Sequence, residues 1–119
     1  MKVFVYFNLH KKVWSVKALS GPNKGRVIAH LDRLVLDDCT FKVSEAGRQR
    51  VLREKRKNVH AGVAGTLSSQ LADFAGVAVT YNPYKYSSFV TRNDEQPIHS
   101  AHRVVLNGRS VSAVPCATH

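Results

Sequence analysis

Six Lys and Arg residues lie between positions 48 and 57, and they are the residues of this sequence best suited to bind an anion. With one glutamate among them, these ten residues carry +5, half of the formal net charge of +10. In a helix, Arg48 and Lys55 project from the same arc as the apolar residues, a costly position for a cation without a partner. We expect Arg48 above all to reach a phosphate in a groove or at a subunit interface. The alternatives are pairing with an aspartate or lying along the apolar face.

Residues 81–89 form the second candidate segment, because they contain three tyrosines, a phenylalanine, an asparagine and a lysine. Aromatic rings stack on nucleic bases, amides hydrogen-bond to base edges, and lysine reaches phosphate. Pro83 favours a loop or a sheet edge, where binding residues are often mounted on a rigid scaffold. The segment predicts a nucleotide pocket, although core packing is the alternative for each single aromatic ring.

Motifs for catalysis are weak by comparison. His99 and His102 are spaced i, i+3, but the sequence has neither the HExxH pattern nor the Cys/His spacing of a zinc site. With Arg103, these histidines would be the candidate acid and base of a nuclease, but no other feature of the sequence supports a nuclease. We therefore expect no enzymatic activity, no metal and no cofactor. Cys39 and Cys116 are expected to be reduced thiols.

The elements that must position these residues are predicted to be strands around one helix. Ser44 is a good N-cap and predicts a helix over 44–59, and residues 68–74 are a candidate for a second short helix. Asn107-Gly108 predicts a tight hairpin. Runs rich in β-branched and aromatic residues predict strands at 3–7, 13–19, 26–30, 40–43, 62–67, 77–81, 88–92, 103–106 and 109–114.

Length and composition place these elements in one domain. The chain has 119 residues and is 44% hydrophobic, which suffices for one modest core. The predicted fold class is α+β, with N-terminal antiparallel strands over 2–43, a central basic helix over 44–59 and C-terminal antiparallel strands over 62–115. No segment approaches the roughly 20 apolar residues of a membrane span, and the apolar run at 3–7 is too short for a signal peptide, so we expect a cytoplasmic protein.

Four strings of this sequence resemble a known family. Residues 2–12 (KVFVYFNLHKK), 47–51 (GRQRV), 56–61 (RKNVHA) and 81–89 (YNPYKYSSF) are similar to small phage and prophage proteins of the Thoeris anti-defence type, in the first-described family of signal sponges. The resemblance implies a non-enzymatic protein of the infected bacterial cytoplasm. Such a protein sequesters cyclic ADP-ribose isomers, in some members also cyclic oligonucleotides, and assembles as a dimer or larger homo-oligomer.

Binding in that family depends on arginines for the phosphates and on aromatic and amide side chains for the base and riboses. The resemblance therefore implies a set of ligand-binding residues in the matching strings and, less directly, in the C-terminal strands: Arg48, Arg50, Arg56, Asn82, Tyr84, Phe89, Arg103 and Arg109.

Two other classes of function remain open. An arginine-rich helix beside exposed aromatic residues also suits a protein that binds RNA or DNA. A basic face could instead dock on an acidic host protein, as an inhibitor carried by a phage would.

Overall fold

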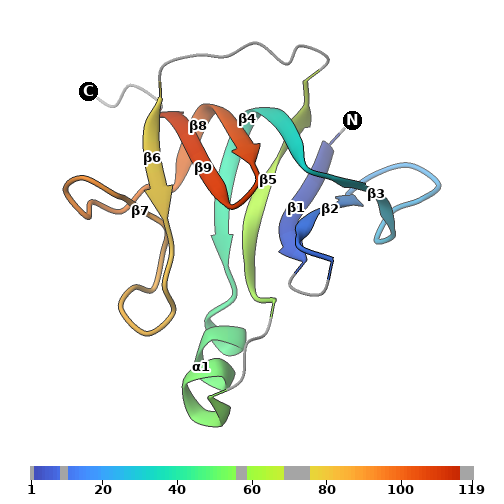
Figure 1. Cartoon of the computed structure of the whole chain (residues 1–119). Coiled ribbons are helices and arrows are strands. Elements are labelled where there is room, and N and C mark those ends of the chain that lie inside the picture. Colours follow the sequence, from blue (N-terminus) through green and yellow to red (C-terminus); the bar gives the residue numbers. More distant parts are fainter. Residues whose placement is uncertain (1, 9–10, 56–58, 69–75, 116–119) are drawn as a thin grey trace.

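The computed structural model describes residues 2–8, 11–55, 59–68 and 76–115 (Figure 1). Within these residues the chain forms nine strands and one helix, α1 (Glu45–Glu54). The strands are β1 (Lys2–Asn8), β2 (Val13–Ala18), β3 (Val27–Leu31), β4 (Arg33–Val43), β5 (Ala61–Leu67), β6 (Val77–Thr80), β7 (Val90–Thr91), β8 (Ser100–Asn107) and β9 (Ser110–Pro115).

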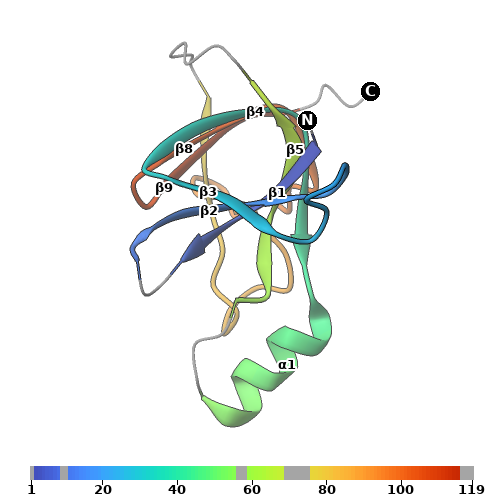
Figure 2. The same ribbon diagram turned by 90° about the vertical axis from the view of Figure 1, so that its right-hand side faces the viewer.

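All nine strands belong to one antiparallel sheet in the order β3-β2-β1-β5-β4-β8-β9-β6-β7. The 11-residue strand β4 joins the two halves of the chain, because it pairs with β5 on one side and with β8 on the other. The sheet is strongly curved (Figure 2). Its curvature brings β2 to the β8–β9 turn, where the Trp14 Nε1 donates a hydrogen bond of 2.7 Å to the Gly108 carbonyl.

The core lies inside this curved sheet. Alternate residues of a strand point to one face, and on β1 these are the buried Val3 and Val5. On β4, by contrast, the three consecutive residues Leu34, Val35 and Leu36 are all buried. The largest of the fully buried side chains are Leu36, Leu106, Val3, Val5, Val16, Val35, Val63 and Val104. The hydrophobic core is therefore built by strands drawn from both halves of the chain.

The predicted α+β fold with a central helix is wrong. Helix α1 lies at the end of the sheet, at the tip of the β4–β5 hairpin, and Val51 is its only buried residue (Figure 1). The same density of cations that drew attention to this segment explains its position, since a helix with so little apolar surface cannot cover a sheet. The strands before and after α1 can then join in one sheet.

The start of α1 agrees with the prediction, and its end does not. The Ser44 Oγ accepts a hydrogen bond of 3.2 Å from the Gly47 amide, as expected of an N-cap. The helix ends after Glu54, because Lys55 adopts a left-handed conformation (φ 55°) and its amide donates to the Val51 carbonyl. Of the predicted 44–59 helix, residues 56–58 lie outside the described residues, as do residues 69–74 of the candidate second helix.

Most strand predictions are confirmed within a few residues. The exception is β4, which was predicted only over 40–43 and begins at Arg33. The predicted β8–β9 hairpin is also present, but shifted by one residue. Asn107 pairs with Ser110, so Gly108 (φ 59°) and Arg109 occupy the two central positions of the turn. Glycine with positive φ at the first central position is typical of tight hairpins.

Candidate ligand-binding groove

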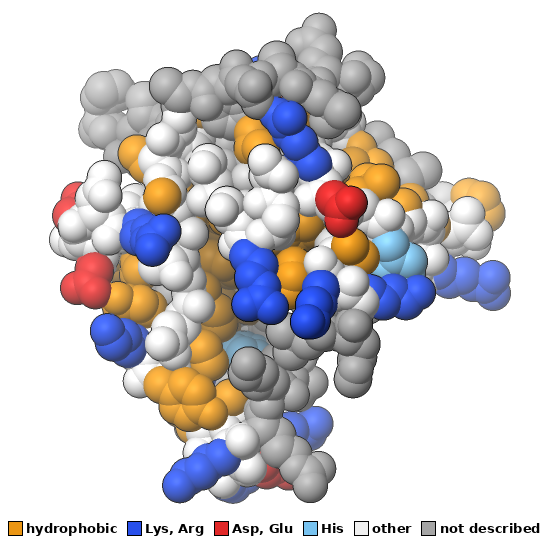
Figure 3. Space-filling view, in the orientation of Figure 1, with side chains coloured by type: hydrophobic (Ala, Val, Ile, Leu, Met, Phe, Trp, Pro, Cys, Tyr) orange, Lys and Arg blue, Asp and Glu red, His pale blue; other side chains and the backbone are white. Residues whose placement is uncertain are grey.

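A hollow of about 680 Å³ opens between α1, the start of β5 and the segment that follows β6. Figure 3 shows hydrophobic side chains exposed in the lower part of this face, with Lys and Arg side chains near them. The residues that line the hollow are Phe7, Val51, Lys55, Val59, His60, Ala61, Thr80, Tyr81, Asn82, Pro83 and Tyr84. It thus combines aromatic surface, an amide and a lysine, and none of these residues is acidic.

A second hollow of about 240 Å³ continues the first toward the β8–β9 turn. The two share Phe7, Ala61, Thr80 and Tyr81, and the second adds Trp14 and Arg109. The Arg109 guanidinium lies 5.8 Å from the centre of the Phe7 ring, and Phe7 packs edge-on against Trp14 at 5.2 Å. We refer to the two hollows together as the groove. Lys55 lines the first hollow and Arg109 lines the second, and aromatic rings line both.

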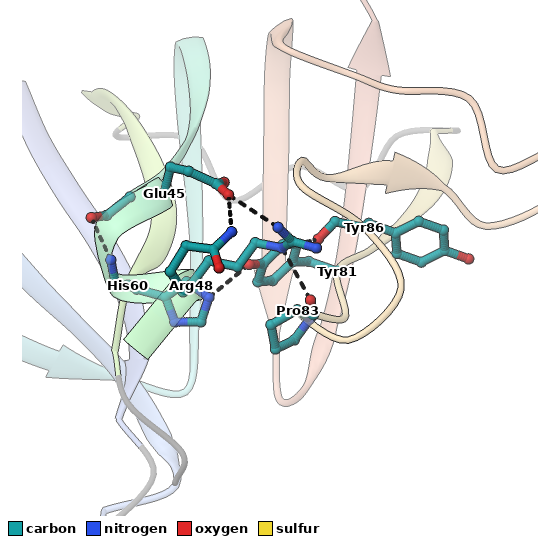
Figure 4. A network of polar contacts seen from close by, with 9 residues as sticks. Glu45, Arg48, His60, Tyr81, Pro83 and Tyr86 are labelled. Atoms are coloured by element: carbon teal, nitrogen blue, oxygen red, sulfur yellow. Dashed lines mark hydrogen bonds and ion pairs between the residues drawn. The ribbon is translucent and has the colours of Figure 1, made fainter. Parts of the chain in front are cut away.

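Arg48 fixes one wall of the groove. Its Nε donates to the Pro83 carbonyl at 3.0 Å and to the Tyr86 carbonyl at 2.8 Å, and its Nη1 lies 3.1 Å from Glu45 Oε1 (Figure 4). Two hydrogen bonds, from Gln49 first and then from Arg48, lower the pKa of the Glu45 carboxyl. Arg48 therefore connects α1 to the loop after β6, and its guanidinium is held by protein oxygens.

His60 and Tyr81 form the floor of the groove. The Tyr81 hydroxyl lies 2.6 Å from His60 Nε2, and the two rings meet edge to face at 5.4 Å (Figure 4). Tyr81 also stacks against Phe89, which contacts Phe41 in the core. Burial raises the pKa of the Tyr81 hydroxyl, as does the negative charge of Glu45, while Arg48 acts in the opposite direction. The His60–Tyr81 pair at the floor therefore contacts the aromatic part of the core through Phe89.

Gly47 explains how His60 reaches this position. A Cβ on Gly47 would lie 2.5 Å from the His60 Cβ, far inside van der Waals contact. The Ser44 amide also donates to the His60 carbonyl at 2.7 Å, directly beyond the last β4–β5 pair. A glycine inside the helix, which is unfavourable by itself, allows the chain leaving α1 to pass close to its first turn.

The loop after β6, which is the wall that Arg48 holds, presents Asn82 and Tyr84 to the groove. The Asn82 Oδ1 accepts a hydrogen bond from the Tyr84 amide at 2.9 Å, and its carbonyl accepts from the amides of Lys85 and Tyr86. These bonds fix the turn. Tyr84 is 59% exposed, which is unusual for a tyrosine that lines a hollow. Its ring is available to a ligand.

Of the eight predicted ligand-binding residues, the structure places Asn82, Tyr84 and Arg109 around the groove and Arg48 behind its wall. Phe89 borders the second hollow, but it is only 9% exposed and belongs to the core.

The other predicted residues lie elsewhere. Arg50 is exposed on α1 and does not line the groove. The Arg103 Nε binds Asp37 Oδ1 at 2.8 Å, joining β8 to β4. Arg56 lies outside the described residues.

Sequence reasoning missed Phe7, His60 and Tyr81 as members of one site. All three lie inside strings already singled out, but nothing in their spacing showed that they meet. The β1–β5 and β6–β9 pairings bring them together, and such long-range pairing has no local sequence signal. Lys55, by contrast, was recognised as a cation on the packing face of the helix, and it lines the groove.

Among the residues that the structure describes, no group of three or more His, Cys, Asp or Glu side chains is placed to hold a metal ion. In the same part of the chain no helix has the length and apolar character of a membrane span.

These features define a class: a small basic protein with one curved antiparallel sheet and a groove beside a helix at its end. Comparison with known proteins then gives the family. The chain belongs to the family described as Mycobacterium phage L5 gene 82 protein, whose profile matches residues 1–114. It is 45% identical over 120 residues to the gene 82 protein of Mycobacterium phage L5, covering 95% of each chain. No solved structure matches. The expectation of a phage protein is confirmed, whereas its anti-defence role stays a prediction.

Proposed function

We propose that this protein binds a small anionic nucleotide in the groove and holds it unchanged, acting as a sponge for cyclic nucleotide immune signals in the cytoplasm of the infected bacterium. The observation that supports the proposal most directly is the combination of Tyr84 and Asn82 on one wall with Lys55 in one hollow and Arg109 in the other. An exposed ring suits a base, and two separated cations suit two phosphates.

The size and charge of the groove agree with such a ligand. Pockets for small molecules span about 300–1,000 Å³, and the main hollow has about 680 Å³. Its ionisable lining residues are Lys55, His60, Tyr81 and Tyr84, none of which is a carboxylate that would repel phosphate. The formal charge of +10 adds a long-range attraction for anions.

The test is a titration of the purified full chain with cyclic ADP-ribose, a cyclic dinucleotide and AMP, each by calorimetry. Trp14 is the only tryptophan and lies beside Phe7 in the groove, so its fluorescence is a second readout of occupancy. We expect Tyr84→Ala to weaken binding of the cyclic ligand by about 5- to 150-fold, since a base stack contributes roughly 1–3 kcal/mol. Lys55→Gln should weaken binding as well. Arg53→Gln, an exposed cation on the same helix, is the matched control.

Two further measurements separate this proposal from its alternatives. Heat denaturation of the complex should release the ligand intact, and an altered product would mean an enzyme. Binding of a dianion should depend weakly on salt, whereas RNA or DNA would give a steep dependence because many counterions are displaced. If no nucleotide binds and single-stranded RNA binds with a steep salt dependence, the nucleic-acid function replaces the sponge. Co-purification of one acidic host protein without any nucleotide would favour the inhibitor.

A further inference from the structure

Exposed apolar side chains fall into two groups on this molecule. Among the described residues, six large hydrophobic side chains are exposed: Leu19, Val27, Ile28, Leu31, Val59 and Tyr84. Val59 and Tyr84 line the groove. The other four lie on β3 or directly after β2 and do not line the groove, and β3 is at the opposite end of the sheet from β6 and β7 (Figure 1). The groove explains the first group and leaves the second without a function.

The second group belongs to an edge strand. β3 is the first strand of the sheet and pairs only with β2, so its outer backbone groups face away from the sheet. The other edge, β7, has two residues, and a bridge between Val90 and Pro97 covers it. Proteins usually protect an edge with charged residues, proline or a bulge. β3 has a bulge at Ile28, but of its five residues four are apolar and none is Lys, Glu or Pro.

The sequence around β3 is complementary to itself. When two antiparallel copies pair with Ala29 opposite Ala29, all five strand residues are matched, and Val27 faces Leu31 twice. The next pair outward on both sides is Arg26 with Asp32, so opposite charges meet at both ends of the contact. Both side chains are exposed, and no ion pair within the chain involves either of them among the described residues.

We infer that two copies of this chain associate through β3, in an antiparallel register centred on Ala29 that joins their sheets across a two-fold axis. A two-fold contact uses the same surface on both copies, so self-complementarity is what it requires. The contact buries Val27, Ile28 and Leu31 and gives the outer backbone groups of β3 hydrogen-bond partners. No residue of β3 lines the groove, so each copy keeps its own ligand site.

Exchange of the two charges tests both the contact and its register. Sedimentation of the wild-type chain over a range of concentrations should show a species of twice 13.2 kDa. Arg26→Asp places two acids opposite each other at each end, and Asp32→Arg places two bases, so each single variant should weaken the dimer at least about tenfold. The double variant restores opposite charges and should regain the dimer. Arg53→Asp and Glu54→Arg on α1 are the matched controls and should remain dimeric.

A cross-link provides a second test that does not depend on charge. Opposed residues of antiparallel strands have Cα atoms about 4.5–5.5 Å apart, which suits a disulfide. With Cys116 changed to Ser, Ala29→Cys should form a covalent dimer on oxidation, and Ile28→Cys, which faces His30 of the second copy, should not. A wild-type chain that stays monomeric at every concentration would overturn the inference. So would a double charge variant that stays monomeric while folded, or equal cross-linking at both positions.

Discussion

Substitution of Arg48 by alanine is the most direct test of how the groove is held. The side chain is 17% exposed, and its Nε donates to two carbonyls of the loop after β6, at 2.8 and 3.0 Å. Hydrogen bonds from a charged donor contribute about 1.5–3 kcal/mol. The ion pair with Glu45 contributes little, because the Glu45 side chain is 57% exposed and water screens the charges. We expect Arg48→Ala to lower the free energy of unfolding by about 2–3 kcal/mol.

The assay combines urea unfolding with amide hydrogen exchange. The amides of Lys85 and Tyr86 donate to the Asn82 carbonyl, so they should exchange faster once the loop is released from α1. Arg50→Ala removes the same charge from an exposed position of the same helix and should change stability by no more than about 0.5 kcal/mol. If the two variants match in stability and in loop exchange, Arg48 does not fix the wall of the groove.

Three further predictions follow from the geometry. Burial raises the pKa of the Tyr81 hydroxyl above its ordinary 10.0, so this group loses its proton at a lower pH in the unfolded chain than in the folded one. The free energy of unfolding should therefore fall as the pH rises past about 10. Unfolding titrations of Tyr81→Phe should show a shallower fall. Gly62→Ala places a Cβ 2.4 Å from the Val5 carbonyl oxygen of the neighbouring strand, so it should cost about 1–3 kcal/mol by chemical denaturation, and an unchanged midpoint would contradict the close packing of β1 on β5. Ser44→Ala removes the oxygen that caps the Gly47 amide and should cost about 1 kcal/mol, measured in the same way, while Ser44→Thr should retain most of the stability.

Local signals in the sequence were reliable here, and long-range ones were not. Ser44 as a cap and Gly108 in a turn depend on a few neighbouring atoms, so residue type alone predicted them. Whether two strand groups form two sheets or one depends on the 11-residue strand β4, which pairs with β8 from Arg33 to Thr40 and with β5 from Leu36 to Val43. That pairing involves residues tens of positions apart, and no local pattern encodes it.

The candidate site shows the same division. The cations of α1 and the aromatic loop were both identified by composition, and Arg48 does join them. Composition could not show which atoms the Arg48 side chain contacts. An arginine that binds backbone carbonyls and an arginine that is free to bind phosphate look the same in a sequence. Arg103 was likewise predicted to bind a ligand, but it binds Asp37, which lies 66 residues earlier in the chain.

The position of α1 has a consequence for the evolution of this family. Strands β4 and β5 remain paired up to Val43 and Ala61, and just beyond this pair the Ser44 amide donates a hydrogen bond to the His60 carbonyl. The positions at which the chain leaves β4 and returns to β5 are therefore fixed by the sheet. Mutations that change the length or the charge of the segment between these positions need not alter the strand register. In this way the segment can differ among related proteins while the sheet stays the same.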